Sequence, residues 1–323
     1  MNRIFNLLDR IKKLLYTDCG RGEVLQERSL VMQARVLSKN YRSLEPNILC
    51  DAEFQVFSQW GEDGVIDWLI SRLPNIPRTF VEFGVQNYRE SNTRFLLISR
   101  NWRGLVIDGS ARNIIDIRSQ DIYWRHDLTA KCAFINRDNI NELISESGFS
   151  DEIGLLSVDI DGNDYWVWQA IKVVSPAIVV CEYNAVLGDQ LPLTIPYSAD
   201  FYRTHAHYSN LYFGASIRAL IQLGESKGYT FVGTTSTGCN AFFIRNDCAL
   251  NITGSLEGAW GFPSTVREAR DRSGNLNYVS GGERRIIINH LPFVEPESGA
   301  SLDLVSWGEI YSQNWNRGQG VKF

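Results

Sequence analysis

Residues 230–245 read TFVGTTSTGCNAFFIR, and this stretch decides the fold. Two apolar runs, at 230–234 and 241–245, flank a cluster of Thr, Ser and Gly residues that favours a turn. The runs are too close together for a helix to fit between them. We therefore predict two antiparallel strands joined as a hairpin.

Short apolar runs precede this hairpin and alternate with amphipathic stretches. That alternation is typical of an α/β fold in which helices cover both faces of a parallel sheet. We predict the other strands at 79–83, 104–108, 122–126, 154–159 and 177–182, and helices at 62–72, 93–100, 111–119, 135–146, 165–171 and 215–227. A mostly parallel seven-stranded sheet with an antiparallel C-terminal hairpin strand is the arrangement of Rossmann-like methyltransferases. A dinucleotide-binding domain keeps its strands parallel.

The chain of 323 residues divides into three parts by pattern. We predict a helical lead-in at 1–57, the Rossmann-like domain at 58–248 and a C-terminal extension at 249–323. Within the domain, residues 185–214 lack periodicity but hold many aromatic and polar side chains. This segment follows the carboxyl end of a strand, where open α/β sheets bind ligands, so we interpret it as an active-site lid.

Composition and charge restrict the class of protein. Hydrophobic residues make up 44% of the chain and charged residues 21%, an ordinary globular balance. The net charge of -5 argues against nucleic acid as a partner. Six cysteines without a CxxC pair argue against a disulfide framework or a structural zinc site. We therefore expect a cytoplasmic protein.

The first sixteen residues carry an amphipathic pattern. One helical stripe is apolar, and basic residues lie off it: the apolar positions are Ile4, Leu7, Leu8, Ile11, Leu14 and Leu15. Two interpretations remain open. The helix either docks on the body or on a partner subunit of a homo-oligomer, or it lies on the inner face of an anionic membrane as a peripheral contact.

The first predicted strand ends in Val81-Glu82-Phe83-Gly84. Gly84 permits a sharp turn and close approach of the backbone to a ligand. Gln86 and Asn87 stand where a dinucleotide fingerprint has glycines, which disfavours NAD and FAD. An acid just before the glycine suits the amino-acid end of S-adenosylmethionine (SAM). A plain strand-to-helix turn is the alternative.

The second predicted strand ends in Asp108-Gly109-Ser110. A carboxylate at this strand end can accept hydrogen bonds from both hydroxyls of a ribose, so we predict that Asp108 binds ribose with Gly109 and Ser110 beside it. Capping of the next helix is the alternative role. Asp127, placed after the third predicted strand, is predicted to contact an adenine amino group.

Three further acids are expected at the same sheet edge. Asp159 and Glu182 end successive predicted strands, and Asp161 follows in a glycine-containing turn. Clustered carboxylates repel one another unless a cation neutralises them, and oxygen ligands select Mg²⁺, Mn²⁺ or Ca²⁺. We predict that Asp159, Asp161 and Glu182 hold a divalent metal. A set of turn-forming and capping acids is the alternative.

Two histidines of the chain are candidates for a general base. His205 and His207 lie in the predicted lid, and a histidine with a pKa near neutrality can deprotonate a hydroxyl. We favour His207 because it is nearer the following helix. Asp161 is the second candidate for a catalytic role.

Five segments in order resemble the FkbM-type SAM-dependent methyltransferases, and the resemblance covers residues 55–245. The matching segments are 58–64 (SQWGEDG), 81–85 (VEFGV), 90–93 (ESNT), 102–110 (WRGLVIDGS) and 156–162 (LSVDIDG). The resemblance implies SAM as methyl donor, with Glu82 and Gly84 near its methionine part, Asp108 on its ribose, and Asn92 in the cofactor site. The chain departs from the family at Asp161, where many members have Glu, and at Gln86-Asn87.

Members of that family methylate hydroxyls of sugars, glycans, polyketides and other small molecules. Metal dependence is known in some related sugar O-methyltransferases. We expect a SAM-dependent O-methyltransferase that acts on a sugar or glycan, such as a surface polysaccharide or a lipid-linked glycan, with a divalent metal (Mg or Mn). Two alternatives stay open: a non-catalytic scaffold with this fold, and a nicotinamide-dependent sugar-modifying enzyme.

Overall fold

The structure is a computed structural model that describes residues 25–43 and 45–323. The amphipathic segment 1–16 and its predicted contact with a membrane or partner lie outside the described residues. Residues 25–42 are helical, and Val31 and Ala34 pack this helix against Phe54, Phe57 and Phe95. Within the described ranges, no helix combines the length and apolar character needed to cross a membrane.

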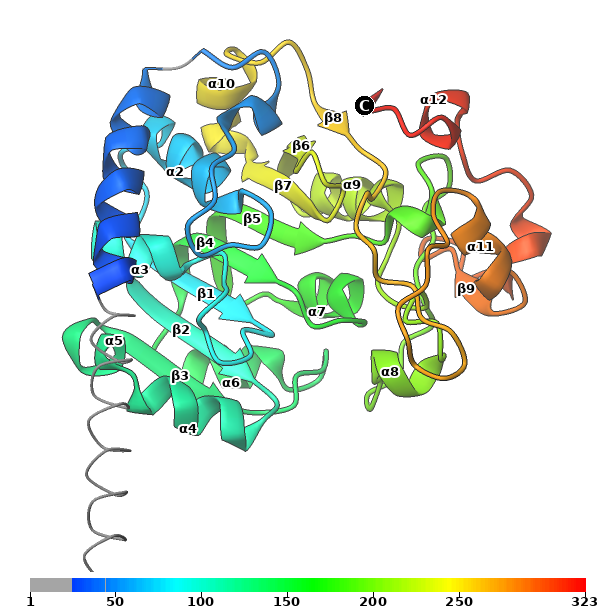
Figure 1. Cartoon of the computed structure of the whole chain (residues 1–323), viewed down its shortest axis with the longest axis horizontal. Coiled ribbons are helices and arrows are strands. Elements are labelled where there is room, and N and C mark those ends of the chain that lie inside the picture. Colours follow the sequence, from blue (N-terminus) through cyan, green and yellow to red (C-terminus); the bar gives the residue numbers. More distant parts are fainter. Residues whose placement is uncertain (1–24, 44) are drawn as a thin grey trace, which may run out of the picture.

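Seven strands form one sheet in the order β3-β2-β1-β4-β5-β7-β6 (Figure 1). Their bounds are β1 Thr79–Phe83, β2 Arg103–Asp108, β3 Leu128–Cys132, β4 Asp151–Val158, β5 Val174–Glu182, β6 Tyr229–Thr234 and β7 Asn240–Arg245. The first five strands pair in parallel, and β7 runs antiparallel to both β5 and β6. The predicted hairpin is confirmed, and with it the Rossmann-like methyltransferase fold.

Helices cover both faces of the sheet, which explains why the strands are nearly continuous apolar runs. One face packs on α6 (Ile140–Glu146), α7 (Asp164–Ala170) and α9 (Ile217–Ser226). The other packs on η1 (Leu49–Ala52), α2 (Glu62–Arg72), α3 (Arg94–Arg100), α4 (Ala111–Ser119) and α10 (Asn246–Thr253). Neighbouring side chains of one strand divide between the two cores: Phe80 packs in the second and Val81 in the first. The residues that line the site follow at the carboxyl ends of these strands.

The predicted strand at 122–126 is wrong. Residues Asp121–Arg125 form the short helix α5, and β3 begins at Leu128. The register of β3 against β2 buries Leu128 and Ala130 in the core, whereas Trp124 of α5 is 72% exposed. The aromatic run therefore lies on the surface, and the less apolar segment after it supplies the strand.

The segment 185–214 is anchored at both ends by the core and by the C-terminal extension. Thr194 exchanges backbone hydrogen bonds with Val294, at 2.9 and 2.8 Å. Tyr311 and Trp315 donate to the carbonyls of Val186 and Ala185. The segment contains η2 (Ala185–Leu187) and α8 (Arg203–Ala206). The extension contains β8 (Trp260–Gly261), α11 (Glu283–Ile288), β9 (Pro292–Val294), β10 (Ser301–Asp303), η3 (Leu304–Trp307), α12 (Gln313–Asn316) and β11 (Val321–Lys322).

Candidate active site

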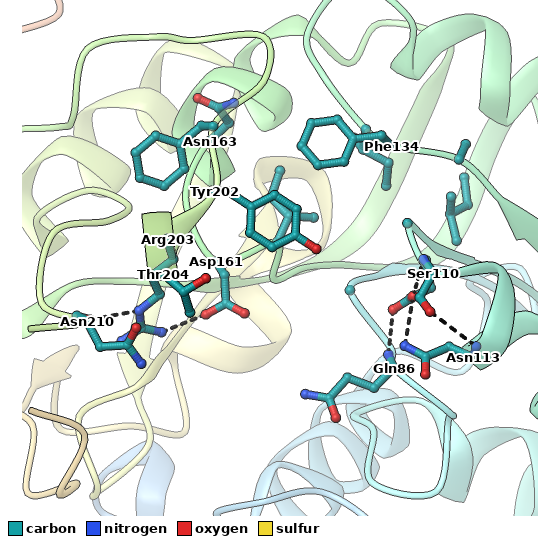
Figure 2. Close-up of a pocket in the computed structure, with 18 residues that line it drawn as sticks. Gln86, Ser110, Asn113, Phe134, Asp161, Asn163, Tyr202, Arg203, Thr204 and Asn210 are labelled. Carbon is teal, nitrogen blue, oxygen red and sulfur yellow. Dashed lines mark hydrogen bonds and ion pairs between the residues drawn. The ribbon is translucent and has the colours of Figure 1, made fainter. Parts of the chain in front are cut away.

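Two adjoining cavities lie where β1, β2, β4 and β5 end. The first, the β2 cavity, has a volume of about 300 Å³ and includes Asp108, Ser110, Phe134 and Tyr202 (Figure 2). The second, the acidic cavity, has a volume of about 660 Å³ and includes Trp60, Glu82, Asn92, Asp159 and Glu182. The residues lining both are Gly84, Gln86, Asp161, Arg203 and Asn210.

Gly84 sits where the two cavities meet, and the turn after β1 requires a glycine there. Its φ is +70°, and a Cβ at this position would lie 1.7 Å from the carbonyl oxygen of Asp159. The sharp turn expected from the sequence is therefore present, and the close contact that requires glycine is with the protein's own backbone. In this structure the β1 turn packs against the end of β4.

Asp108 ends β2 and is 7% exposed. One carboxylate oxygen accepts from the backbone N–H of Gln86 at 2.8 Å. The other accepts from the Ser110 N–H at 2.8 Å and from Asn113 Nδ2 at 3.0 Å (Figure 2). Ser110 in turn caps α4. A carboxylate offers about four acceptor sites, so Asp108 holds the loop and still has capacity for one further donor.

The Glu82 carboxylate accepts hydrogen bonds from other residues of the protein. It accepts from Ser91 Oγ at 2.6 Å, from the Asn92 N–H at 2.9 Å and from Thr93. Burial raises the pKa of Glu82, and these hydrogen bonds oppose the shift. Asn92 extends the network by donating to Ser157 Oγ at 3.1 Å. Glu82 thus shapes the wall of the acidic cavity by holding the 91–93 turn in place.

Two predicted site residues lie away from the cavities. Asp127 precedes β3, at the amino edge of the sheet, where its carboxylate lies 3.8 Å from Arg103 Nε. The adenine contact predicted for Asp127 therefore fails, because it depended on the misplaced strand. His207 belongs to neither cavity lining. Its Nδ1 pairs with Ser209 Oγ at 2.7 Å, and burial and the neighbouring His290 lower its pKa.

The predicted convergence of three acids is confirmed. Asp159, Asp161 and Glu182 place carboxylate oxygens within 4.8 Å of one another. Burial and then the charge of Asp161 raise the pKa of Asp159, while burial and then Asp159 raise the pKa of Glu182. Glu182 Oε2 is buried without a hydrogen-bond partner among the described residues. Such a cluster favours a cation or a hydroxyl donor.

Arg203, from α8, supplies a positive charge to this cluster. Its Nη1 lies 2.6 Å from Asp161 Oδ1 and 4.0 Å from Glu182 Oε1. Its Nη2 pairs with Glu268 of the C-terminal extension at 2.5 Å. Burial disfavours the charged guanidinium, but Glu182, Glu268 and Asp161 together raise the pKa of Arg203 above its usual value. Sequence reasoning missed this residue, since an arginine in a loop carries no local signal of its partners.

An aromatic pair borders the β2 cavity. The rings of Phe134, which follows β3, and Tyr202 stack at a centroid distance of 6.0 Å and an interplanar angle of 15° (Figure 2). Both rings are partly exposed, at 44% and 56%. Phe134 was missed because β3 was placed too early in the chain. The pair offers flat apolar surfaces in the same cavity as Asp108.

No model of a protein family matches this chain, and no curated protein matches it. Among solved structures, the N-terminal domain of EvdMO1 with SAH bound is similar, at 9% identity and a TM-score of 0.38, over 66% of this chain and 96% of that one. An O-methyltransferase from Bacillus cereus in complex with SAH is similar at 12% identity and a TM-score of 0.38, over 67% of this chain and 89% of that one. The fold assignment rests on the strand order and the antiparallel β7 rather than on these likenesses.

Proposed function

We propose that this protein is an FkbM-type SAM-dependent O-methyltransferase that methylates a hydroxyl of a sugar or glycan. The observation that carries the proposal is the meeting of acids from β2, β4 and β5 around two connected cavities at the carboxyl edge of a methyltransferase sheet. Open α/β sheets bind ligands at this edge. The sequence segments that resemble the FkbM type favour SAM as the methyl donor.

SAM, when bound, supplies a methyl group on a positively charged sulfur. Asp108 has an acceptor site left for a ribose hydroxyl. Phe134 and Tyr202 border the same cavity and can stack on the adenine. Asp161 lies at the junction of the two cavities, and Asp159 and Glu182 lie beside it in the second cavity; together these acids favour the positive sulfonium.

The acidic cavity is suited to a polyhydroxyl acceptor. Its lining combines hydrogen-bonding groups such as Asn92 and Glu182 with Trp60, which is 37% exposed. An exposed indole can pack on the apolar face of a sugar ring while carboxylates and amides accept and donate to its hydroxyls. The two cavities share Gly84 and Asp161, so an acceptor in one can reach a donor in the other.

The unpartnered Glu182 Oε2 is the group best placed to accept the proton of the acceptor hydroxyl. Arg203, whose Nη1 lies 4.0 Å from Glu182 Oε1, opposes the rise in the pKa of Glu182 that burial and Asp159 cause. Asp161 retains the catalytic role predicted for it. His207 has no role in this mechanism, because it lies outside both cavity linings.

The same acids fit a divalent metal. Three carboxylates lie within 4.8 Å, and Glu182 keeps an orphaned buried oxygen. Asp159, Asp161 and Glu182 would hold Mg²⁺ or Mn²⁺, whose chemistry is to lower the pKa of a bound hydroxyl. Asp161 is already paired with Arg203, so a metal ion and the guanidinium compete for this carboxylate.

The proposal is tested by incubating the protein with labelled SAM and a pool of sugars and glycans, followed by mass spectrometry for one added methyl. Glu182→Gln should lower turnover by about 10²–10⁴-fold if Glu182 acts as base. Glu225→Gln, an exposed position on α9, is the matched control. Chelation by EDTA should abolish turnover and spare SAM binding. Full activity after chelation would contradict the proposed metal site. Failure of the folded protein to bind SAM would contradict the proposed methyltransferase activity.

A further inference from the structure

A third cavity, here called the arginine pocket, lies between the helix at 25–42, the turn after β1 and α5. It has a volume of about 530 Å³. Five arginines and two carboxylates line it: Arg28, Arg35, Arg89, Arg94, Arg125, Glu27 and Asp121. The lining therefore carries an excess of three positive charges in a chain whose net charge is -5.

Both carboxylates of the arginine pocket are already engaged. Glu27 pairs with Arg94 at 3.3 Å, and Asp121 pairs with Arg125 at 2.6 Å. Among the described residues, Arg28 and Arg89 have no ion pair. Exposed arginines often lack a partner, but here they surround a cavity with a buried arginine in its lining. The uncompensated charge is therefore concentrated on one concave surface.

Buried polar groups of the pocket also lack partners. Arg94 is 3% exposed, and its Nε has no hydrogen-bond partner among the described residues, although its Nη1 donates to the Tyr88 carbonyl and to Gln120 Oε1. His126 Nδ1 is likewise buried without a partner. Burial and the charges of Arg125 and Arg94 lower the pKa of His126. A neutral imidazole can still donate one hydrogen bond to an anion.

Arg89 connects this pocket to the proposed acceptor site, because it also lines the acidic cavity. A ligand bound at the acids that end β4 and β5 would have to extend past Arg89 to reach the other arginines. Guanidinium groups bind phosphate oxygens in a bidentate manner. The apolar lining by Val31, Ile98 and Ile122 leaves room for a non-polar part of the same ligand.

We propose that the arginine pocket binds a phosphate or diphosphate group of the acceptor, so that the substrate is a phosphate-bearing sugar. The sugar part of this statement rests on the proposed function, whereas the anion site stands on its own residues. A nucleic acid would require a basic stripe along an extended surface, and here the excess charge lines one pocket.

The test is a calorimetric titration with inorganic pyrophosphate. The wild-type protein should bind it, and Arg28→Gln and Arg89→Gln should each weaken binding by about 10- to 100-fold, the scale of a lost charge-assisted hydrogen bond. Arg78→Gln is the matched control, because Arg78 is exposed just before β1, at the opposite edge of the sheet. Absence of binding, or an equal loss in Arg78→Gln, would overturn the proposal.

Two further arms distinguish the sources of the phosphate. Competition of uridine diphosphate with pyrophosphate would indicate a soluble nucleotide-linked sugar. Sedimentation with phosphatidylglycerol vesicles that Arg28→Gln reduces would indicate a lipid phosphate. SAM titrations of the same variants separate the two proposals. Pyrophosphate binding without SAM binding defeats the methyltransferase and leaves the anion site, whereas SAM binding without pyrophosphate binding defeats the anion site alone.

Discussion

Replacing Arg203 by Gln should tighten the binding of a divalent cation at the acid cluster. In the structure the guanidinium lies 2.6 Å from Asp161 Oδ1 and 4.0 Å from Glu182 Oε1. It therefore neutralises part of the charge that a metal would neutralise, and it repels an ion held by the same oxygens. Gln keeps a polar but shorter side chain and removes the charge.

The magnitude follows from Coulomb's law. Two unit charges 4.0 Å apart interact by about 4 kcal/mol at an effective dielectric constant of about 20. The two side chains of this pair are 12% and 17% exposed, but Asp161, the other carboxylate beside Arg203, is 60% exposed, so solvent screens much of its interaction. We therefore expect about tenfold tighter binding, equivalent to about 1.4 kcal/mol.

The assay is calorimetric titration of Mn²⁺ into the SAM-free protein, with circular dichroism to verify the fold. Arg317→Gln, an exposed position after α12, is the control and should leave Mn²⁺ affinity unchanged. Adding Glu182→Gln to Arg203→Gln should reverse the gain, because a ligand is lost. Equal or weaker Mn²⁺ binding in folded Arg203→Gln would refute the view that these acids form a cation site.

Three more substitutions test the framework of the site. Gly84→Ala places a Cβ 1.7 Å from the Asp159 carbonyl at a φ of +70°, so urea unfolding should show a loss of about 3 kcal/mol, and a loss under about 0.5 kcal/mol would contradict the packing. Asp63→Ala leaves three backbone N–H groups of residues 56–58 without their acceptor, which should lower the free energy of unfolding by about 3 kcal/mol, with Asp63→Asn milder. Tyr202→Ala removes the stack on Phe134, and SAM affinity should fall by about 1 kcal/mol in a binding titration; an unchanged affinity would place the adenine elsewhere.

The position of the acid cluster could be predicted because it follows from strand ends. In a parallel sheet all carboxyl ends meet at one edge, so Asp159 and Glu182 had to converge once β4 and β5 were recognised as strands. Asp108 followed from the same rule at the end of β2. The hairpin of β6 and β7 was equally accessible, since a short turn cluster between two apolar runs leaves one connection.

Other features depended on tertiary contacts that no local pattern records. The aromatic run around Trp124 resembles a strand by composition, but only pairing with β2 selects Leu128–Cys132 instead. That error moved Asp127 to the wrong edge and hid Phe134. Arg203 meets Asp161 across 42 positions of sequence, and its pairing depends on how the segment 185–214 packs on the C-terminal extension.

In the proposed reaction, SAM binds in the β2 cavity with Asp108 on its ribose. Calorimetric titration with S-adenosylhomocysteine tests it most directly, using the wild-type protein, Asp108→Ala, and Asp127→Ala at the opposite edge of the sheet. The structure predicts one binding site in the wild type, weakening of about 10- to 100-fold in Asp108→Ala, and no change in Asp127→Ala. Absence of binding by the folded wild-type protein, or equal affinity in all three proteins, would contradict the claim.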